Sequence, residues 1–203
     1  MTAFLIGVWG CGSAPVPREG PRSIRAASDT TADAANLIVE ADLQRALELM
    51  RRRQYDQAES VLKSIVNSRD RSTVTLLNLG ITYSQLGKLP EAEQSLRQAL
   101  EEDPANFIAY NELGIINRKA GRFQQARDAY EHALMLRPNY ALAHLNLGIL
   151  CDMYLQNVEC AIRHYRAYQQ FGGSEDPPVD LWIDDLKRRY PEQRWRGSEG
   201  AGQ

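Results

Sequence analysis

The 203-residue chain lacks an apolar run of about 20 residues, the length that a helix needs to cross a bilayer. Its charges nearly balance at a formal net charge of −2, and its few basic clusters lack interleaved aromatic residues, which argues against nucleic-acid binding. It also lacks a nucleophile elbow, a phosphate-binding glycine loop, a metal-ligand motif and an acid pair at a special spacing. We therefore expect no catalysis, no cofactor, no metal and no small-molecule substrate.

The chain does contain an internal repeat. Gly80, Gly114 and Gly148 stand 34 residues apart, and each is preceded by leucine and followed by isoleucine. After each of the first two glycines, alanine recurs at two fixed distances and proline at a third. The recurring residues are Ala92 and Ala126, Ala99 and Ala133, and Pro104 and Pro138.

The residues around each glycine have helical periodicity. Leu76, Leu79, Gly80 and Tyr83 recur at steps of three and four residues, which places them on one helix face. A glycine within a helix costs about 1 kcal/mol relative to alanine, so its recurrence requires a reason in the contact between helices. We predict that the glycine faces the alanine of the next helix, such as Ala92, and lets the two helices approach closely.

A 34-residue period with small residues at these offsets and proline at the end resembles the tetratricopeptide repeat (TPR). This resemblance implies an all-α fold, a right-handed superhelical solenoid of about four helix-turn-helix hairpins followed by a C-terminal capping helix. A divergent first unit has Ala46 at the glycine place and Ala58 at the alanine place. In the fourth unit Ala161 stands one residue late, so the turn between Leu155 and Val158 contains one extra residue.

Composition divides the chain into segments. Proline, serine and charged residues fill 11–33, which we predict to be a disordered tether. The solenoid is expected over 34–171, and an amphipathic capping helix over 179–190. A disordered tail is expected over 191–203.

The first ten residues are mostly apolar and end at Cys11. Val8-Trp9-Gly10-Cys11 resembles a bacterial lipobox, which implies that 1–10 is a signal peptide and that Cys11 is lipidated. Since no lysine or arginine precedes the apolar run, we expect the natural translation start to lie upstream of Met1. The alternative is a disordered N-terminus with an unmodified cysteine.

The two other cysteines, Cys151 and Cys160, fall on the two helices of the predicted fourth hairpin, near its turn. In an exported protein they are candidates for a disulfide, whereas in a reducing compartment they are two buried thiols. The sequence leaves both alternatives open. His132, His144 and His164 do not stand at zinc-ligand spacing from these cysteines.

The resemblance also implies a binding surface. In tetratricopeptide repeats the first helix of each unit lines a concave groove that binds peptides. Lysine and asparagine, which clamp a C-terminal carboxylate in some members, are absent from the required pairs of positions, so that function is not supported. The groove residues carried over are Leu43, Leu47, Val74, Leu77, Ile81, Ile108, Asn111, Ile115, Arg118, Lys119, Leu142, Leu145 and Ile149.

These residues form an apolar band with a polar centre, which suits an amphipathic helix or an extended apolar peptide. The alternative is that several of them, Ile81, Ile115 and Ile149 above all, are half-buried between stacked helices. With the lipobox, the architecture is similar to the lipoproteins that assist assembly of type IV pilus secretins, which implies an outer-membrane scaffold facing the periplasm. The alternatives are a cytoplasmic adaptor or regulator, and an accessory subunit of an envelope enzyme.

Overall fold

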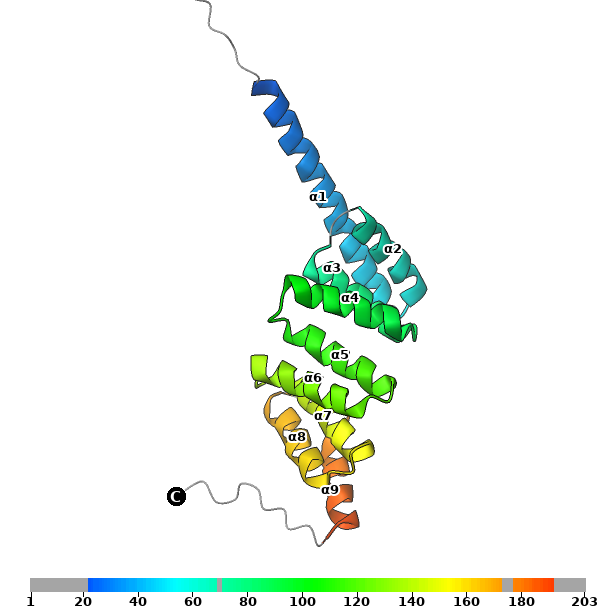
Figure 1. Ribbon diagram of the computed structural model, residues 1–203, viewed down its shortest axis with the longest axis vertical. Helices are drawn as coiled ribbons and strands as arrows, with labels where there is room; N and C mark the ends of the chain where they lie inside the picture. The colour runs from blue at the N-terminus through cyan, green and yellow to red at the C-terminus, as the bar shows by residue number, and fades with distance from the viewer. Residues whose placement is uncertain (1–21, 69–70, 173–176, 192–203) are drawn as a thin grey trace, which may run out of the picture. The chain divides into compact units, whose positions relative to one another are not determined.

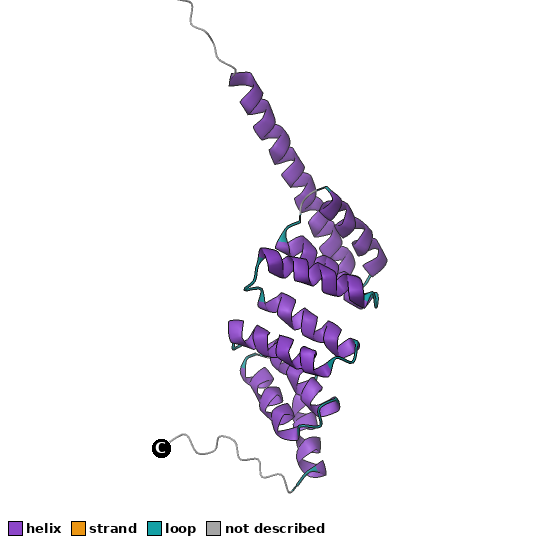
Figure 2. Ribbon diagram, viewed as in Figure 1, coloured by secondary structure: helices purple, strands orange, loops and turns teal. Residues whose placement is uncertain are grey.

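The computed structural model describes the backbone of residues 22–68, 71–172 and 177–191, with the side chains of these ranges from residue 36 onward. Across these ranges the secondary structure is helical, with short loops and turns between the helices (Figure 2). The chain divides into two units, 1–38 and 39–203. The described part of the first unit is the beginning of α1 (Arg22–Arg51), whose remainder belongs to the second unit.

The other described helices all belong to the second unit. They are α2 (Tyr55–Asn67), α3 (Thr73–Gln85), α4 (Leu89–Glu102), α5 (Phe107–Lys119), α6 (Phe123–Leu136), α7 (Ala141–Met153), α8 (Val158–Gln170) and α9 (Val179–Arg189).

The start of α1 differs from the predicted tether. Residues 22–33 are helical, although we predicted disorder as far as 33. No proline or glycine stands between Arg22 and Arg51, and five of the ten residues in 26–35 are alanine, which favours a helix. The predicted signal peptide, Cys11, the rest of the tether and residues 192–203 of the predicted tail lie outside the described residues.

The helices of the second unit form successive hairpins (Figure 1). Helices α3 and α4, α5 and α6, and α7 and α8 pack against each other as pairs, and each pair contacts the next through α4 with α5 and α6 with α7. The C-terminal part of α1 packs with α2 and α3 around the buried residues Ala46, Leu62 and Leu79. The predicted all-α solenoid of stacked hairpins is confirmed.

Each repeated glycine faces a large side chain of the second helix. A Cβ atom at Gly80 would lie 2.7 Å from Cγ of Leu96, and one at Gly148 would lie 2.6 Å from Cδ1 of Tyr165. The ring of Tyr130 closes the space over Gly114 in the same way. A Cβ atom at Gly80 would also lie 3.3 Å from the carbonyl oxygen of Ala92, so the predicted close approach of this glycine to Ala92 is confirmed. At all three glycines, however, the nearest atoms belong to a residue one turn further along the second helix.

The turns inside the hairpins share one backbone feature, a residue in the left-handed region. Gly87 and Gly121 both have φ of 75°, whereas Arg53 and Gln156 adopt φ of 59° and 51° at the equivalent places. Side chains rarely occupy this region because their Cβ atom is crowded there. The extra residue of the fourth hairpin lies in this turn, where the Asn157 N–H donates to the Cys151 carbonyl at 2.8 Å.

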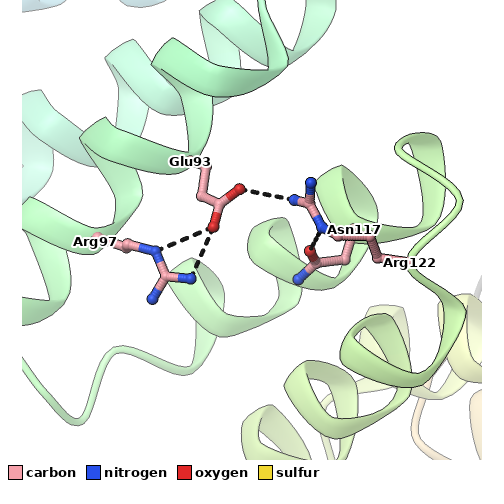
Figure 3. Close-up of polar contacts among 4 residues, drawn as sticks. All are labelled: Glu93, Arg97, Asn117 and Arg122. Carbon is pink, nitrogen blue, oxygen red and sulfur yellow. Dashed lines mark hydrogen bonds and ion pairs between the residues drawn. The ribbon is translucent and has the colours of Figure 1, made fainter.

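Ion pairs join successive hairpins on the side of these turns. The Arg122 guanidinium donates to Glu93 at 2.7 Å across the boundary between α4 and α6, and Arg97 donates to the same carboxylate (Figure 3). Arg122 is itself oriented by a bond from Nε to Oδ1 of Asn117, at 2.7 Å. One repeat earlier, the Lys88 ammonium lies 2.6 Å from Glu59.

Helix α9 lies where the capping helix was expected. Its buried residues Val179, Ile183 and Leu186 join the core that α8 borders, and Trp182 meets the Tyr165 ring edge-on at a centroid distance of 5.4 Å. Its opposite face carries exposed charges. An amphipathic helix at the end of a stack covers the apolar side of the last repeat.

Candidate functional site

The surface formed by the first helices of the hairpins, α3, α5 and α7 with the end of α1, is called here the groove face. Its most exposed predicted residues are Val74 and Leu142, each 51% exposed at the start of its helix. Met153, at the end of α7, is 68% exposed. Ile108, which lies at the start of α5 in the place that Val74 and Leu142 occupy on α3 and α7, is half-buried. The groove face thus presents apolar side chains to solvent at the ends of its helices.

Most central residues of the groove face are half-buried. Ile115, Leu145 and Ile149 pack against the core built by α6, α7 and α8. Leu77 packs against the core around Leu96, and Leu43 against the core around Leu62. Of the two alternatives that the sequence left open, half-burial between stacked helices describes these five positions.

A hollow of ≈ 450 Å³ opens at the junction of α1, α2 and α3. It brings together the predicted groove residues Leu47 and Ile81, with Met50 beside them. Sequence reasoning missed Tyr55, because the family pattern assigns binding positions to first helices and Tyr55 begins a second helix. The remaining lining residues are Gln44, Arg51 and Gln85. An apolar floor with a polar and cationic rim suits an apolar anchor side chain.

Asn111, which we predicted to be at the polar centre of the groove, is only 1% exposed. Its Oδ1 accepts a hydrogen bond from Nδ2 of Asn146 at 3.0 Å, and its own Nδ2 donates to Glu112 at 3.3 Å. A buried amide needs such partners to offset its lost hydration. Asn111 therefore holds α7 against α5 and does not present its amide to solvent.

Lys119 also makes a bond between repeats. Its ammonium donates to the backbone carbonyl of Ser84 at 2.8 Å and to the Ser84 hydroxyl at 3.1 Å. Ser84 lies in the last turn of α3, where carbonyl groups lack helical partners and attract cations. Burial lowers the pKa of Lys119. Lys119 thus joins α5 to α3, as Asn146 joins α7 to α5.

Arg118 differs from its two predicted neighbours in the polar centre. Its guanidinium is half-buried and lies close to the hydroxyls of Tyr130 and Tyr154. Yet its Nε and the Tyr130 hydroxyl are both buried without a hydrogen-bond partner in the described part of the chain. Burial raises the pKa of Tyr130 to about 12, so the phenol stays neutral.

The carboxylates of α5 and α7, Glu112 and Asp152, are already engaged. Glu112 is bound by Asn111, and burial raises the pKa of its carboxyl. Asp152 accepts a hydrogen bond from the Tyr165 hydroxyl at 3.2 Å, and its other oxygen lies 4.0 Å from the Arg189 guanidinium. The exposed polar character of this part of the groove face is therefore cationic.

Cys151 and Cys160 are joined by a disulfide, with their Cα atoms 5.8 Å apart. The bond connects the end of α7 to the start of α8 across the turn that carries the extra residue. Both residues are buried in the core of the last hairpin. Of the two alternatives left open for these cysteines, the structure has the bonded one.

Two histidines that we considered only as zinc ligands form a pair instead. Nδ1 of His144 lies 2.9 Å from Nδ1 of His164, and Nε2 of His144 lies 2.9 Å from the Pro138 carbonyl. Since a carbonyl only accepts, His144 carries its proton on Nε2, and His164 must donate from Nδ1. Their separation of 20 residues gave no signal for this contact, because it depends on how α7 and α8 pack.

A search of the described ranges finds no group of three histidine, cysteine or acidic side chains placed to hold a metal ion. Within the same ranges, no helix has both the length and the apolar character needed to span a bilayer.

The repeat pattern matches a known family. Residues 77–141 and 117–176 each match the family model described as Tetratricopeptide repeat. The chain therefore contains tetratricopeptide repeats, in agreement with the period and the hairpins described above. No curated protein matches the chain.

Several solved structures have a similar fold. Pseudomonas aeruginosa PilF matches with a TM-score of 0.68 at 20% identity, over 77% of this chain and 71% of that chain. Desulfovibrio magneticus RS-1 MamA matches with a TM-score of 0.62 at 20% identity, over 75% of this chain and 85% of that chain. A thermophilic TPR protein of Thermus thermophilus, TTC0263, matches with a TM-score of 0.64 at 18% identity, over 74% of this chain and 82% of that chain.

Likeness at such identities shows the fold alone. Tetratricopeptide repeats, which residues 77–141 and 117–176 match, form scaffolds that bind protein partners. The groove face is therefore the candidate binding surface of these repeats.

Proposed function

We propose that this protein is a bacterial envelope lipoprotein, anchored through Cys11, that holds a segment of a protein partner on its groove face and assists assembly of a pilus or secretion machine. The binding part of this proposal rests on one observation. Val74, Leu142 and Met153 expose apolar side chains on the groove face, and Leu47 and Ile81 line its hollow. Such an exposed apolar surface on a repeat scaffold favours an amphipathic helix or an extended peptide.

Two observations support the envelope location. The lipobox-like sequence ends at Cys11, which lies outside the described residues. The disulfide between Cys151 and Cys160 is typical of proteins in oxidising compartments, among them the bacterial periplasm. The fold likeness to PilF is consistent with this proposal but concerns the fold alone.

Intact mass spectrometry of the protein from the membrane fraction of its native host tests the anchor. We expect the mass of a chain that begins at Cys11 and carries acyl groups, and we expect a Cys11→Ala variant to lack that mass. An unprocessed chain in the soluble fraction would instead favour a cytoplasmic adaptor, and the envelope proposal would be abandoned.

Site-specific photo-crosslinking in the native host tests the groove face. A photoreactive residue at Leu142 should crosslink to one defined partner, and a second change, Val74→Glu, should reduce that crosslink strongly. Met135 on α6, which is 70% exposed, is the matched control position and should not give this product. Leu77 and Leu145 are unsuitable for such substitutions because they are half-buried. Equal crosslinking from Leu142 and Met135 would contradict the proposed binding surface.

A further inference from the structure

The buried polar atoms of Arg118 and Tyr130 indicate which chemical group of the partner would bind at this part of the groove face. Both the Arg118 Nε and the Tyr130 hydroxyl are buried, and both lack an acceptor in the described part of the chain. A guanidinium has five N–H donors and no acceptor, so it cannot satisfy itself. Leaving a buried donor unpaired is unfavourable, and more so for a charged group.

The fourth hairpin has an equivalent arrangement with a carboxylate in place. Tyr165 packs over Gly148 as Tyr130 packs over Gly114. The residue four positions after each glycine lies beside the tyrosine hydroxyl, and it is Asp152 in the fourth hairpin and Arg118 in the third. In the fourth hairpin the tyrosine hydroxyl donates to the Asp152 carboxylate. In the third, the residue beside the tyrosine hydroxyl is the cationic Arg118, and within the described ranges no carboxylate is among the groups that act on its guanidinium.

The acidic residues of the chain near Arg118 do not supply this carboxylate. Glu112 is bound by Asn111, and Asp152 by Tyr165. Lys119, the next residue after Arg118, adds a second cation to the end of α5. Although the whole chain has a formal net charge of −2, this part of the groove face attracts anions.

The surroundings of Arg118 on the groove face are apolar. Ile115 lies one helical turn before it on the same face of α5. Met153, which is exposed at the end of α7, stands 35 positions after Arg118, the same separation that the bonds from Lys119 to Ser84 and from Asn146 to Asn111 span. An occupant that matches this surface has a carboxylate next to apolar side chains.

We propose that Arg118 binds a side-chain carboxylate from an acidic, amphipathic segment of the partner. The carboxylate reaches the guanidinium from its exposed edge, and the buried Tyr130 hydroxyl does not contact it. Apolar residues of the same segment cover Ile115 and Met153. This inference rests on the proposed binding of a partner segment to the groove face. It differs from a clamp for a C-terminal carboxylate, since Arg118 does not occupy a position of that clamp.

Fluorescence anisotropy with designed peptides tests the inference. The probe is a fluorescein-labelled, C-terminally amidated amphipathic helix of about 14 residues, with leucine on one face and glutamate beside it. The control peptide has glutamine at every glutamate. We expect the glutamate peptide to bind the wild-type protein roughly 10-fold or more tightly than it binds Arg118→Gln, because a desolvated charge pair is lost. We expect the glutamine peptide to bind both proteins equally.

Three controls separate the alternatives. Arg166→Gln, at an exposed position on α8, should leave binding of the glutamate peptide unchanged. Tyr130→Phe should leave the binding of both peptides unchanged, because the Tyr130 hydroxyl is buried and does not contact the peptide. Circular dichroism melting of each variant shows whether the fold is retained, and Arg118→Lys, which keeps the charge, should recover part of the affinity.

The possible results lead to different conclusions. If the two peptides bind the wild-type protein equally, the carboxylate site is wrong while the groove face stands. If neither binds, the proposed function and this inference both fail. If the wild-type chain forms a dimer in analytical ultracentrifugation that Arg118→Gln abolishes, the occupant is a second copy, and the inference of an acidic partner is wrong.

Discussion

Arg122 reaches back from its own hairpin to Glu93 of the preceding one, with 2.7 Å between Nη2 and Oε2. Lys88 makes the same contact with Glu59, and both pairs are 29 residues apart. At the next boundary the corresponding residues are Asn157 and Arg127, and Arg127 pairs with Glu131 on its own helix instead. The ion pair is thus part of the repeat in the first hairpins and is lost where the turn is longer.

We predict that Glu93 and Arg122 are energetically coupled. Both side chains are partly exposed, so the coupling free energy in a double-mutant cycle with Glu93→Gln and Arg122→Gln should be about 0.5–1 kcal/mol. Urea unfolding monitored by circular dichroism measures it. The coupling free energy should decrease at high salt. In the matched cycle, Arg97→Gln should show a smaller coupling free energy with Arg122→Gln than Glu93→Gln does. A coupling of zero at low salt would show that the pair only reflects the hairpin geometry.

Gly114→Ala should destabilise the protein by about 2–3 kcal/mol, because the added methyl group would overlap the Tyr130 ring. The first repeat suggests a rescue, since Ala46 occupies the glycine place there and Leu62 packs in the same core. The double variant Gly114→Ala with Tyr130→Leu should therefore lose less stability than the sum of the two single changes. Urea midpoints of the four proteins test this, and strict additivity would contradict the predicted contact.

Arg53 and Gln156 occupy left-handed turn positions that glycine fills at Gly87 and Gly121. Arg53→Gly and Gln156→Gly should each stabilise the protein by up to about 1 kcal/mol through relief of backbone strain. Gly87→Ala and Gly121→Ala should have the opposite effect and a similar magnitude. Thermal melting of the four single variants gives the comparison. Destabilisation by both new glycines would mean that the loss of side-chain contacts outweighs the relief of strain.

The His144 and His164 pair should make the last hairpin sensitive to acid. Burial and the neighbouring His144, Arg163 and Arg127 lower the pKa of His164 from 6.5 to about 4, and burial lowers the pKa of His144. Protonation of His144 would set two N–H donors against each other, and protonation of His164 would place a buried positive charge beside His144. The unfolded chain therefore takes up these protons first as the pH falls.

Stability from this pair is present above about pH 6.5 and is lost as the pH falls towards about 4, by roughly 3 kcal/mol for His164. Urea midpoints across this range measure the decline. The double variant His144→Phe with His164→Phe should show a shallower decline, whatever its absolute stability. If the slope with pH is unchanged in that variant, the titration belongs to other groups.

The sequence by itself determined the repeat and its helices. A glycine every 34 residues, with leucines at helical spacing around it, already requires paired helices that stack, because a single hairpin cannot bury its apolar face. The extra residue near Gln156 and the amphipathic character of α9 were also visible in the order of the residues. These features depend on neighbours along the chain, and short-range physics sets them.

The tertiary structure decided which surface residues are free to bind. Family positions placed Asn111, Arg118 and Lys119 in one polar centre, yet Asn111 and Lys119 are engaged by Asn146 and Ser84, and Arg118 lacks a partner for its buried Nε. The contacts between His144 and His164 and the bond between the two cysteines depend in the same way on the approach of α7 and α8. Such features could not be read in sequence order, because they arise where two helices pack against each other and the geometry of that packing selects the partners.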